Sequence, residues 1–69
     1  MSPVEYVISY RLQKAQEQLF ESDKSILDIA VETGFGTSSY FGKIFRQSYG
    51  ITPKEYRKLY RRGQERNYP

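Results

Sequence analysis

A capped helix start occurs twice in this chain, fifty residues apart, and this repeat limits the folds that the sequence can adopt. The segment Met1-Ser2-Pro3-Val4-Glu5-Tyr6 returns as Ile51-Thr52-Pro53-Lys54-Glu55-Tyr56. In each copy a hydroxyl residue can cap a helix, proline fits the first helical position, and glutamate can reach back to complete a capping box. The spacing predicts a repeated helical unit of about fifty residues. We therefore expect a fragment of a longer protein that begins at the tail of one unit and runs through a second.

Length and composition predict one small domain and exclude most catalytic designs. A chain of 69 residues buries only about 60% of its unfolded surface, so one domain over residues 1–69 is expected. The sequence has no cysteine and no histidine, which excludes disulfides, zinc sites built from those ligands and imidazole chemistry. Its carboxylates are scattered and no nucleophile has a neighbouring base. We expect no enzyme activity, no cofactor and no metal.

The sequence carries no signal for a membrane or for export. No apolar run approaches the length of a membrane span, and residues 1–20 lack the basic start and cleavage site of a secretory signal. We therefore expect a cytoplasmic protein with no membrane partner.

The net charge of +3 is distributed unevenly between the two parts of the chain. Residues 1–42 carry three Lys or Arg and six Asp or Glu, whereas residues 43–69 carry eight and two. The basic part is expected to lie where a polyanion binds. A solvated helical face followed by a basic tail explains the charge equally well.

Hydrophobic spacing and capping residues predict four helices and no strand. The expected organisation is a helix within residues 1–21, a pair of helices within 25–50, a C-terminal helix over 52–62 and a tail over 63–69. Ser25 and Thr37 are expected to cap the two helices of the pair, with the second running over Ser38–Tyr49, and Gly34 to end the first in a left-handed conformation.

The expected core follows the apolar spacing of these helices. The first half of helix 1–21 is apolar almost all round, so we expect it to contact two subdomains, one of them outside this chain. Its alternative is a fully buried helix in a bundle. The expected buried residues are Ile8, Leu12, Ala15, Leu19, Phe20, Ile26, Ile29, Ala30, Phe35, Phe41, Ile44, Phe45 and Tyr49.

Two short helices joined by a glycine-containing turn are the requirement for a helix-turn-helix. Ala30 is small where the two helices would cross, and Gly34 follows at the bend. The pattern alone is also compatible with an ordinary helical hairpin.

The residues within this pattern resemble the second helix-turn-helix of the AraC/XylS family of bacterial transcription regulators. The resemblance rests on Ile26-Leu27-Asp28-Ile29-Ala30, Gly34-Phe35, Ser39-Tyr40-Phe41 with Phe45 and Arg46, Gly50-Ile51-Thr52-Pro53 and Tyr56-Arg57. Upstream, Tyr6, Arg11-Leu12, Ala15 and Leu19 resemble the linker helix of that family. The resemblance covers residues 1 to about 62 and implies an all-α fold, a small helical bundle whose homeodomain-like helix-turn-helix follows a long linker helix.

The resemblance also implies a function and a set of contacts. The partner is double-stranded DNA, with RNA polymerase beside it, and the parent protein has a first helix-turn-helix and a regulatory domain. Such proteins are usually activators. The implied base-facing residues are Ser38, Ser39, Gly42 and Lys43, and the implied groove-edge or phosphate contacts are Thr37, Tyr40, Arg46, Ser25, Lys54 and Arg57.

Side-chain chemistry agrees with this assignment but leaves alternatives. Lys43 can reach guanine acceptors or a phosphate, and short serines can bond to several bases. Ser38 and Ser39 are also simply good residues for a first helical turn, and Gly42 either permits close approach of DNA or is merely tolerated. The Phe and Tyr content invites an RNA-stacking interpretation, although the phenylalanines fall on core spacings.

Two classes of function remain. The first is sequence-specific DNA binding. The second is a protein-interaction module whose basic C-terminal helix meets an acidic partner such as RNA polymerase, while the missing first subdomain makes the main DNA contact.

Overall fold

Four helices follow one another along the part of the chain that the structure describes. The computed structural model describes residues 2–65, with side chains placed over residues 2–60. The helices are α1 (Pro3–Glu21), α2 (Ile26–Glu32), α3 (Ser38–Tyr49) and α4 (Pro53–Glu65), and no strand occurs within these residues. The expected all-α fold is confirmed.

The repeated helix start forms the same capping box in both copies. The backbone N–H of Glu5 donates to Ser2 Oγ at 3.1 Å, and the N–H of Ser2 donates back to the Glu5 carboxylate at 3.3 Å. Thr52 and Glu55 repeat the pair at 3.1 and 3.0 Å. These contacts satisfy backbone donors that the first turn of a helix leaves without a partner.

The turn between α2 and α3 depends on glycine. Gly34 has φ +92°, a left-handed conformation that residues with a Cβ rarely adopt. The N–H of Phe35 donates to the Ala30 carbonyl at 2.8 Å, and that of Gly34 to the Val31 carbonyl at 3.2 Å. This pair of bonds is a Schellman ending, and it turns the buried Phe35 ring back towards the core.

The core lies where α1, α2 and α3 meet. Its fully enclosed side chains include Ala15, Leu19 and Phe45, and the Phe41 and Phe45 rings pack edge to face with centroids 5.7 Å apart. The buried set is Leu12, Ala15, Leu19, Ile29, Ala30, Phe35, Phe41 and Phe45, with Ile8, Ile26, Ile44 and Tyr56 packed against it.

Two residues expected in the core are exposed instead. Phe20 is 38% exposed and Tyr49 is 39% exposed. Tyr49 packs one side of its ring on Phe45, with centroids 4.5 Å apart, but it lies in the last turn of α3, beyond which little of the chain can cover it. Phe20 follows the buried Leu19 and therefore points to another side of α1.

The C-terminal helix is longer than expected. The predicted helix 52–62 and tail 63–69 are wrong at their boundary, because α4 continues to Glu65. Gly63 costs about 1 kcal/mol relative to alanine within a helix, which weakens the helix without ending it. The rest of the expected tail, residues 66–69, lies outside the described residues.

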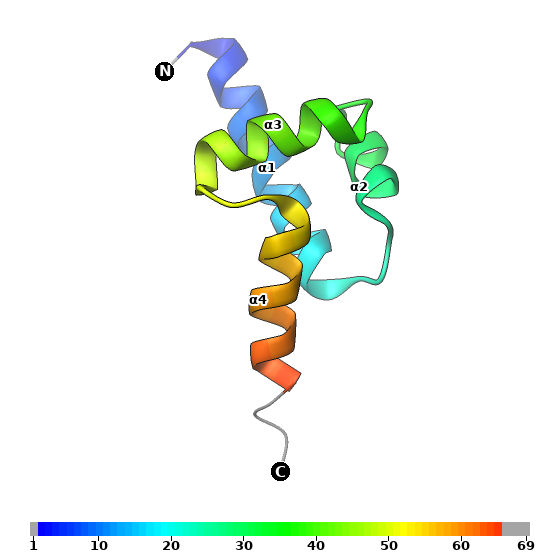
Figure 1. The fold of residues 1–69 in the computed structure, drawn as a ribbon. Helices are drawn as coiled ribbons and strands as arrows, with labels where there is room; N and C mark the ends of the chain where they lie inside the picture. Colours follow the sequence, from blue (N-terminus) through cyan, green and yellow to red (C-terminus); the bar gives the residue numbers. More distant parts are fainter. Residues whose placement is uncertain (1, 66–69) are drawn as a thin grey trace.

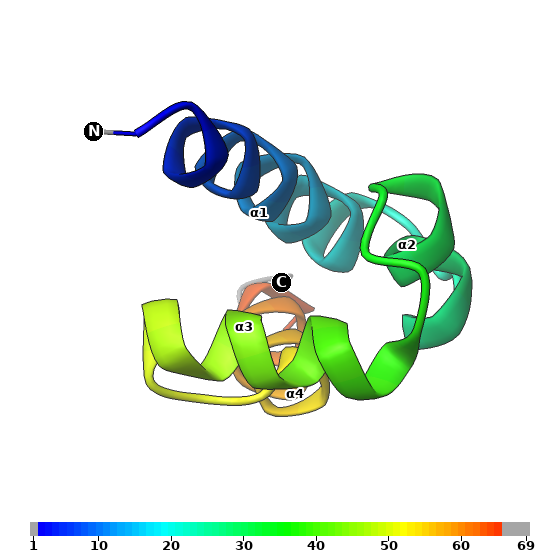
Figure 2. The same cartoon turned by 90° about the horizontal axis from the view of Figure 1, so that it is seen from above.

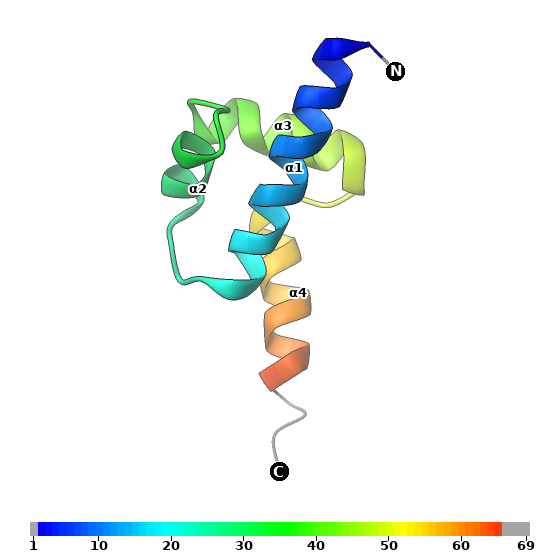
Figure 3. The same ribbon diagram turned by 180° about the vertical axis from the view of Figure 1, so that it is seen from behind.

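The helices are arranged so that α3 crosses α1 and α4 leads away from the crossing. Figure 1 shows α3 in front of α1, with α2 beside them and α4 extending towards the C-terminus. The view from above in Figure 2 places α1 and α3 on opposite sides of the core, and the view from behind in Figure 3 shows the last turns of α1 next to the start of α4. Direct contacts join α1 to α2 and α4, and α3 to α2 and α4.

The first half of α1 extends beyond the core with its apolar side chains exposed. Val4 is 67% exposed, Tyr6 66% and Tyr10 54%. The fully buried alternative for this helix is therefore wrong. None of the helices described over residues 2–65 combines the length and the apolar character that a membrane span needs.

Candidate nucleic-acid interface

One side of α3 is anchored in the core, and the opposite side carries two of the predicted base-facing residues, Ser39 and Lys43. Phe41 and Phe45 are completely buried, whereas Ser39 and Lys43, at the complementary helical positions, are exposed. Ser38 is also exposed at the first position of the helix. The aromatic anchors therefore fix the direction in which this polar side faces.

Gly42 lies on the same helix with open space beside it. A Cβ built at this position would meet nothing within 4 Å, and the residue is not in a left-handed conformation. The fold therefore does not require glycine at this place. The absence of a side chain lowers the surface beside Ser39 and Lys43, so that another molecule can approach the backbone closely.

Thr37 and Tyr40 lie at the start of α3. Thr37 Oγ1 accepts the backbone N–H of Tyr40 at 3.1 Å, which makes Thr37 the cap of the helix. The Tyr40 ring is 45% exposed and lies 6.0 Å, centroid to centroid, from Phe35 of the turn. The positive end of a twelve-residue helix dipole is thus bordered by a hydroxyl and a partly anchored phenol.

Arg46 is exposed in the last turns of α3 and has an acidic neighbour. The backbone N–H and hydroxyl of Thr52 both donate to Glu55 and hold the pKa of its carboxyl below its usual range, with a smaller contribution from the positive charge of Arg46. Glu55 stays ionised and offsets part of the Arg46 charge.

Ser25 and Lys54 are exposed at the starts of α2 and α4. Ser25 Oγ accepts the N–H of Asp28 at 3.0 Å, so this hydroxyl is the cap of α2. Lys54 is the second residue of α4. Both lie on elements other than α3, as contacts that flank a reading helix would.

Arg57 of α4 turns its guanidinium towards the backbone of the protein itself. Its guanidinium donates three hydrogen bonds to backbone carbonyls, those of Leu19 at 3.1 Å, Ser22 at 3.1 Å and Lys24 at 2.6 Å. These bonds direct the side chain inward to the end of α1. The sequence could not indicate this, because the partners lie 33 to 38 residues away.

Gln47 was not among the predicted site residues. It is exposed and lies one turn beyond Lys43 on the same side of α3. Glutamine can form paired hydrogen bonds with adenine. Continuing the helical spacing from Ser39 and Lys43 would have identified it.

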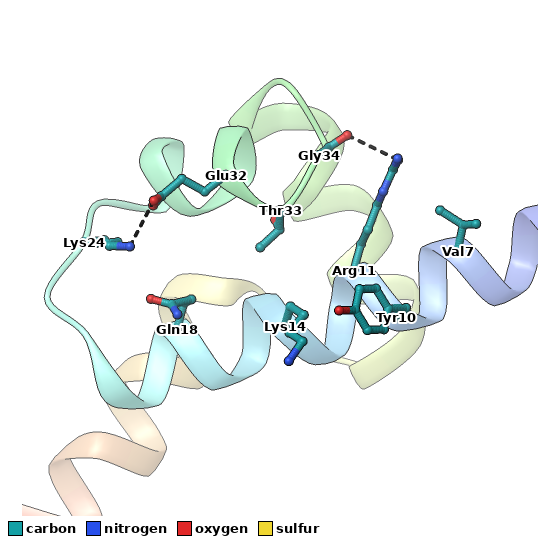
Figure 4. Close-up of a pocket in the computed structure, with 9 residues that line it drawn as sticks. All are labelled: Val7, Tyr10, Arg11, Lys14, Gln18, Lys24, Glu32, Thr33 and Gly34. Atoms are coloured by element: carbon teal, nitrogen blue, oxygen red, sulfur yellow. Dashed lines mark hydrogen bonds and ion pairs between the residues drawn. The ribbon is translucent and has the colours of Figure 1, made fainter.

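A groove of about 630 Å³ lies between α1 and α2 and contains none of the predicted base-facing residues. Figure 4 shows two polar contacts across it, from Arg11 to the Gly34 carbonyl at 3.4 Å and from Lys24 to Glu32 at 3.0 Å. Within residues 2–65, no three His, Cys, Asp or Glu side chains gather as metal ligands would.

Comparison with known proteins identifies similar chains among transcription regulators. A family model described as a helix-turn-helix domain matches residues 1–59. The HTH-type transcriptional activator RhaS of Mannheimia succiniciproducens is 43% identical over 56 residues, which cover 81% of this chain and 21% of that protein. The melibiose operon regulatory protein of Escherichia coli K12 is 42% identical over 55 residues, covering 80% and 18%. This chain therefore spans about a fifth of the length of these relatives.

Two solved structures share the fold. The DNA-binding domain of AdpA, in complex with a target DNA, matches with a TM-score of 0.91 and 30% identity, over 97% of this chain and 60% of that one. The C-terminal domain of the response regulator YesN from Fusobacterium nucleatum matches with a TM-score of 0.80 and 33% identity, over 83% and 55%.

Proposed function

This chain belongs to the AraC/XylS family of transcription regulators as a DNA-binding domain, and we propose that it recognises its operator by placing α3 in the major groove. The observation that carries the proposal is the two-sided construction of α3. Phe41 and Phe45 are fully buried, and the opposite side presents Ser39 and Lys43, with the half-exposed Gly42 beside them. A helix held in this way can enter the groove without disturbing the core.

The base contacts follow from the chemistry of the exposed side. Lys43 donates to the acceptors of guanine, and Ser38 and Ser39 bond to several bases with modest discrimination. Gly42 lets the backbone approach the base edges. Gln47 extends the surface by one turn and prefers adenine.

The phosphate contacts surround the reading helix. The start of α3, capped by Thr37, favours a negative charge through the helix dipole. Tyr40, Arg46, Ser25 and Lys54 add donors at the edges of the groove. Arg57 is left out of this set because its hydrogen bonds go to backbone carbonyls.

The parent protein is proposed to contain a first helix-turn-helix that covers the apolar first half of α1. Support comes from the exposure of Val4, Tyr6 and Tyr10 and from the greater length of the relatives. A regulatory domain and contact with RNA polymerase complete the proposal. The relatives are named as transcription regulators rather than enzymes, and we propose the same for this protein, acting on DNA in the cytoplasm.

Directed cleavage of DNA tests the placement of α3. The chain has no native cysteine, so a cysteine at Ser39 in an otherwise cysteine-free parent protein can carry an iron chelate that cuts nearby DNA. The control is a cysteine at Glu17, which is exposed on the side of α1 opposite Leu12 and Leu19. The duplex is one selected by the parent protein from a random-sequence pool.

The two cysteine variants have distinct expected results. The Ser39→Cys conjugate should cut at a few adjacent bases across the major groove, and the Glu17→Cys conjugate should give little cleavage. Equal weak cleavage from both positions would contradict the insertion of α3 into the groove.

A further inference from the structure

We propose that Arg57 is a positioning residue that fixes the direction of α1 relative to the reading motif, and that it thereby sets the spacing of operator half-sites the parent protein accepts. This inference rests on the proposed function, since the spacing matters only if α1 joins two DNA-reading subdomains.

The geometry around Arg57 joins three elements at one guanidinium. Arg57 belongs to α4, the Leu19 carbonyl to the last turn of α1, and the Ser22 and Lys24 carbonyls to the connection that leads into α2. All three nitrogens of the guanidinium take part, at 2.6 to 3.1 Å. A planar fork of this kind holds its partners in one relative orientation, which a lysine ammonium cannot do.

The position of Arg57 also suits the charge at the end of α1. The last turn of α1 contains no basic residue of its own, although the carbonyls there carry the negative end of the helix dipole. Arg57 supplies the missing cation from α4. It is half-buried, so solvent screens this interaction less than it screens a surface ion pair.

A neighbouring contact acts in the same direction. Gln16 of α1 donates to the hydroxyl of Tyr56 at 2.8 Å, and the Tyr56 ring packs edge to face on Phe45 of α3 with centroids 5.6 Å apart. Tyr56 and Arg57, two consecutive residues of α4, thus join this helix to three other parts of the fold. These are α1, the loop before α2 and the core side of α3. Loss of the Arg57 bonds would loosen the end of α1 where it meets the loop of residues 22–25.

The test compares Arg57→Lys and Arg57→Gln with Lys58→Gln in the full-length protein. Lys58 is the next residue of α4 and is exposed, so its substitution removes the same charge without touching the carbonyls. Binding is measured to a duplex selected from a random-sequence pool by the unmodified protein, and to that duplex with one base pair inserted between its half-sites. Each titration is repeated at two salt concentrations, under conditions where unfolding curves show the variant to be folded.

The positioning role predicts that both Arg57 variants lose about tenfold of the preference for the selected spacing, while the salt dependence is unchanged. Lys58→Gln should keep the spacing preference. Without DNA, amide exchange in residues 22–25 should quicken by about tenfold in Arg57→Gln and stay unchanged in Lys58→Gln.

Two results would overturn the inference. In the first, Arg57→Lys binds DNA like the unmodified protein, while Arg57→Gln lowers the slope of log affinity against log salt concentration by about one. Arg57 would then neutralise a phosphate. If both variants keep the spacing preference, Arg57 contributes only stability. Neither result affects the cleavage experiment at Ser39, so a failure here is distinguishable from a failure of the proposed function.

Discussion

Arg11 of α1 lies directly over Gly34 of the turn between α2 and α3. A Cβ built on Gly34 would stand 2.9 Å from Arg11 Nε and 3.0 Å from Cζ, and the guanidinium donates to the Gly34 carbonyl at 3.4 Å. Gly34 is therefore required for its left-handed backbone, and a side chain at this position would also displace the flexible end of Arg11. The Gly34 carbonyl lies just beyond the C-terminal end of α2, where the negative end of the helix dipole favours the positive charge of Arg11.

Substitution at Gly34 should cost more than substitution at the other glycine of the turn. Gly34→Ala should destabilise the domain by about 2 kcal/mol, through strain at φ +92° and displacement of Arg11. Gly36→Ala is the matched control, because Gly36 has φ +87° but nothing within 4 Å of its Cβ position. Urea unfolding measures both variants.

A second substitution isolates the Arg11 contact. Arg11→Ala should cost less in the Gly34→Ala background than in the unmodified protein, because the contact has already been displaced. Equal costs in the two backgrounds, or equal losses for the two glycine variants, would show that only backbone strain matters at Gly34.

Ala30 should not tolerate a larger side chain. It is fully buried where α2 packs on the core, and its carbonyl accepts the Phe35 N–H that closes the turn. Ala30→Leu should cost about 1 to 3 kcal/mol of stability by overpacking. Val31→Leu, at a position that is 56% exposed, is the control and should change the melting temperature little. A neutral Ala30→Leu would contradict the close approach of the helices.

The capping box of α4 predicts a specific dependence on pH. The pKa of Glu55 is held below its usual range by the Thr52 bonds, so this carboxylate stabilises the folded state above its unfolded pKa of about 4.3. That contribution is lost as the pH falls through the lower folded pKa.

An NMR titration of the Glu55 carboxyl carbon measures this effect. In Thr52→Ala the pKa of Glu55 should rise part of the way towards its usual range, because the hydroxyl bond to the carboxylate is lost while the bond from the backbone N–H, the larger cause of the lowered pKa, remains. Ser2→Ala removes the matching cap of α1 and should leave the Glu55 titration unchanged. The same rise in both variants would show that the shift does not come from the cap.

The apolar first half of α1 should cause the isolated 69-residue chain to self-associate. Tyr6 and Val4 together expose a surface that soluble monomers usually cover. Replacing both with serine should return the chain to a monomer in sedimentation experiments. The control replaces Leu59 and Tyr60 of α4, which are 60% and 53% exposed, with serine. If this variant also becomes a monomer, self-association does not depend specifically on the first half of α1.

Local chemistry explains which parts of the fold could be predicted from the sequence. The caps at Ser2, Ser25 and Thr37 and the turn at Gly34 depend on contacts within a few residues, and all were predicted correctly. The buried faces followed from helical spacing. Tyr49 was placed wrongly because spacing identifies a side of a helix but not how far the core extends along it, and Phe20 because it lies next to the buried Leu19, on another side of α1.

The tertiary role of Arg57 could not be predicted in this way. An arginine in a basic helix is compatible with a phosphate contact, and only the fold brings it to the end of α1. The helix boundary near residue 62 failed for a related reason, since a glycine within good helix formers does not by itself determine a helix end.

The most direct test of the account is the affinity of Lys43→Ala in the parent protein, compared with Lys58→Ala. Both lysines are exposed and carry the same charge, but only Lys43 lies on the outward side of α3. Lys43→Ala should weaken binding to the selected duplex by about 1 to 3 kcal/mol and reduce its preference over a random duplex. Lys58→Ala should weaken both duplexes about equally. If Lys43→Ala leaves the affinity for the selected duplex intact, α3 is not the reading helix.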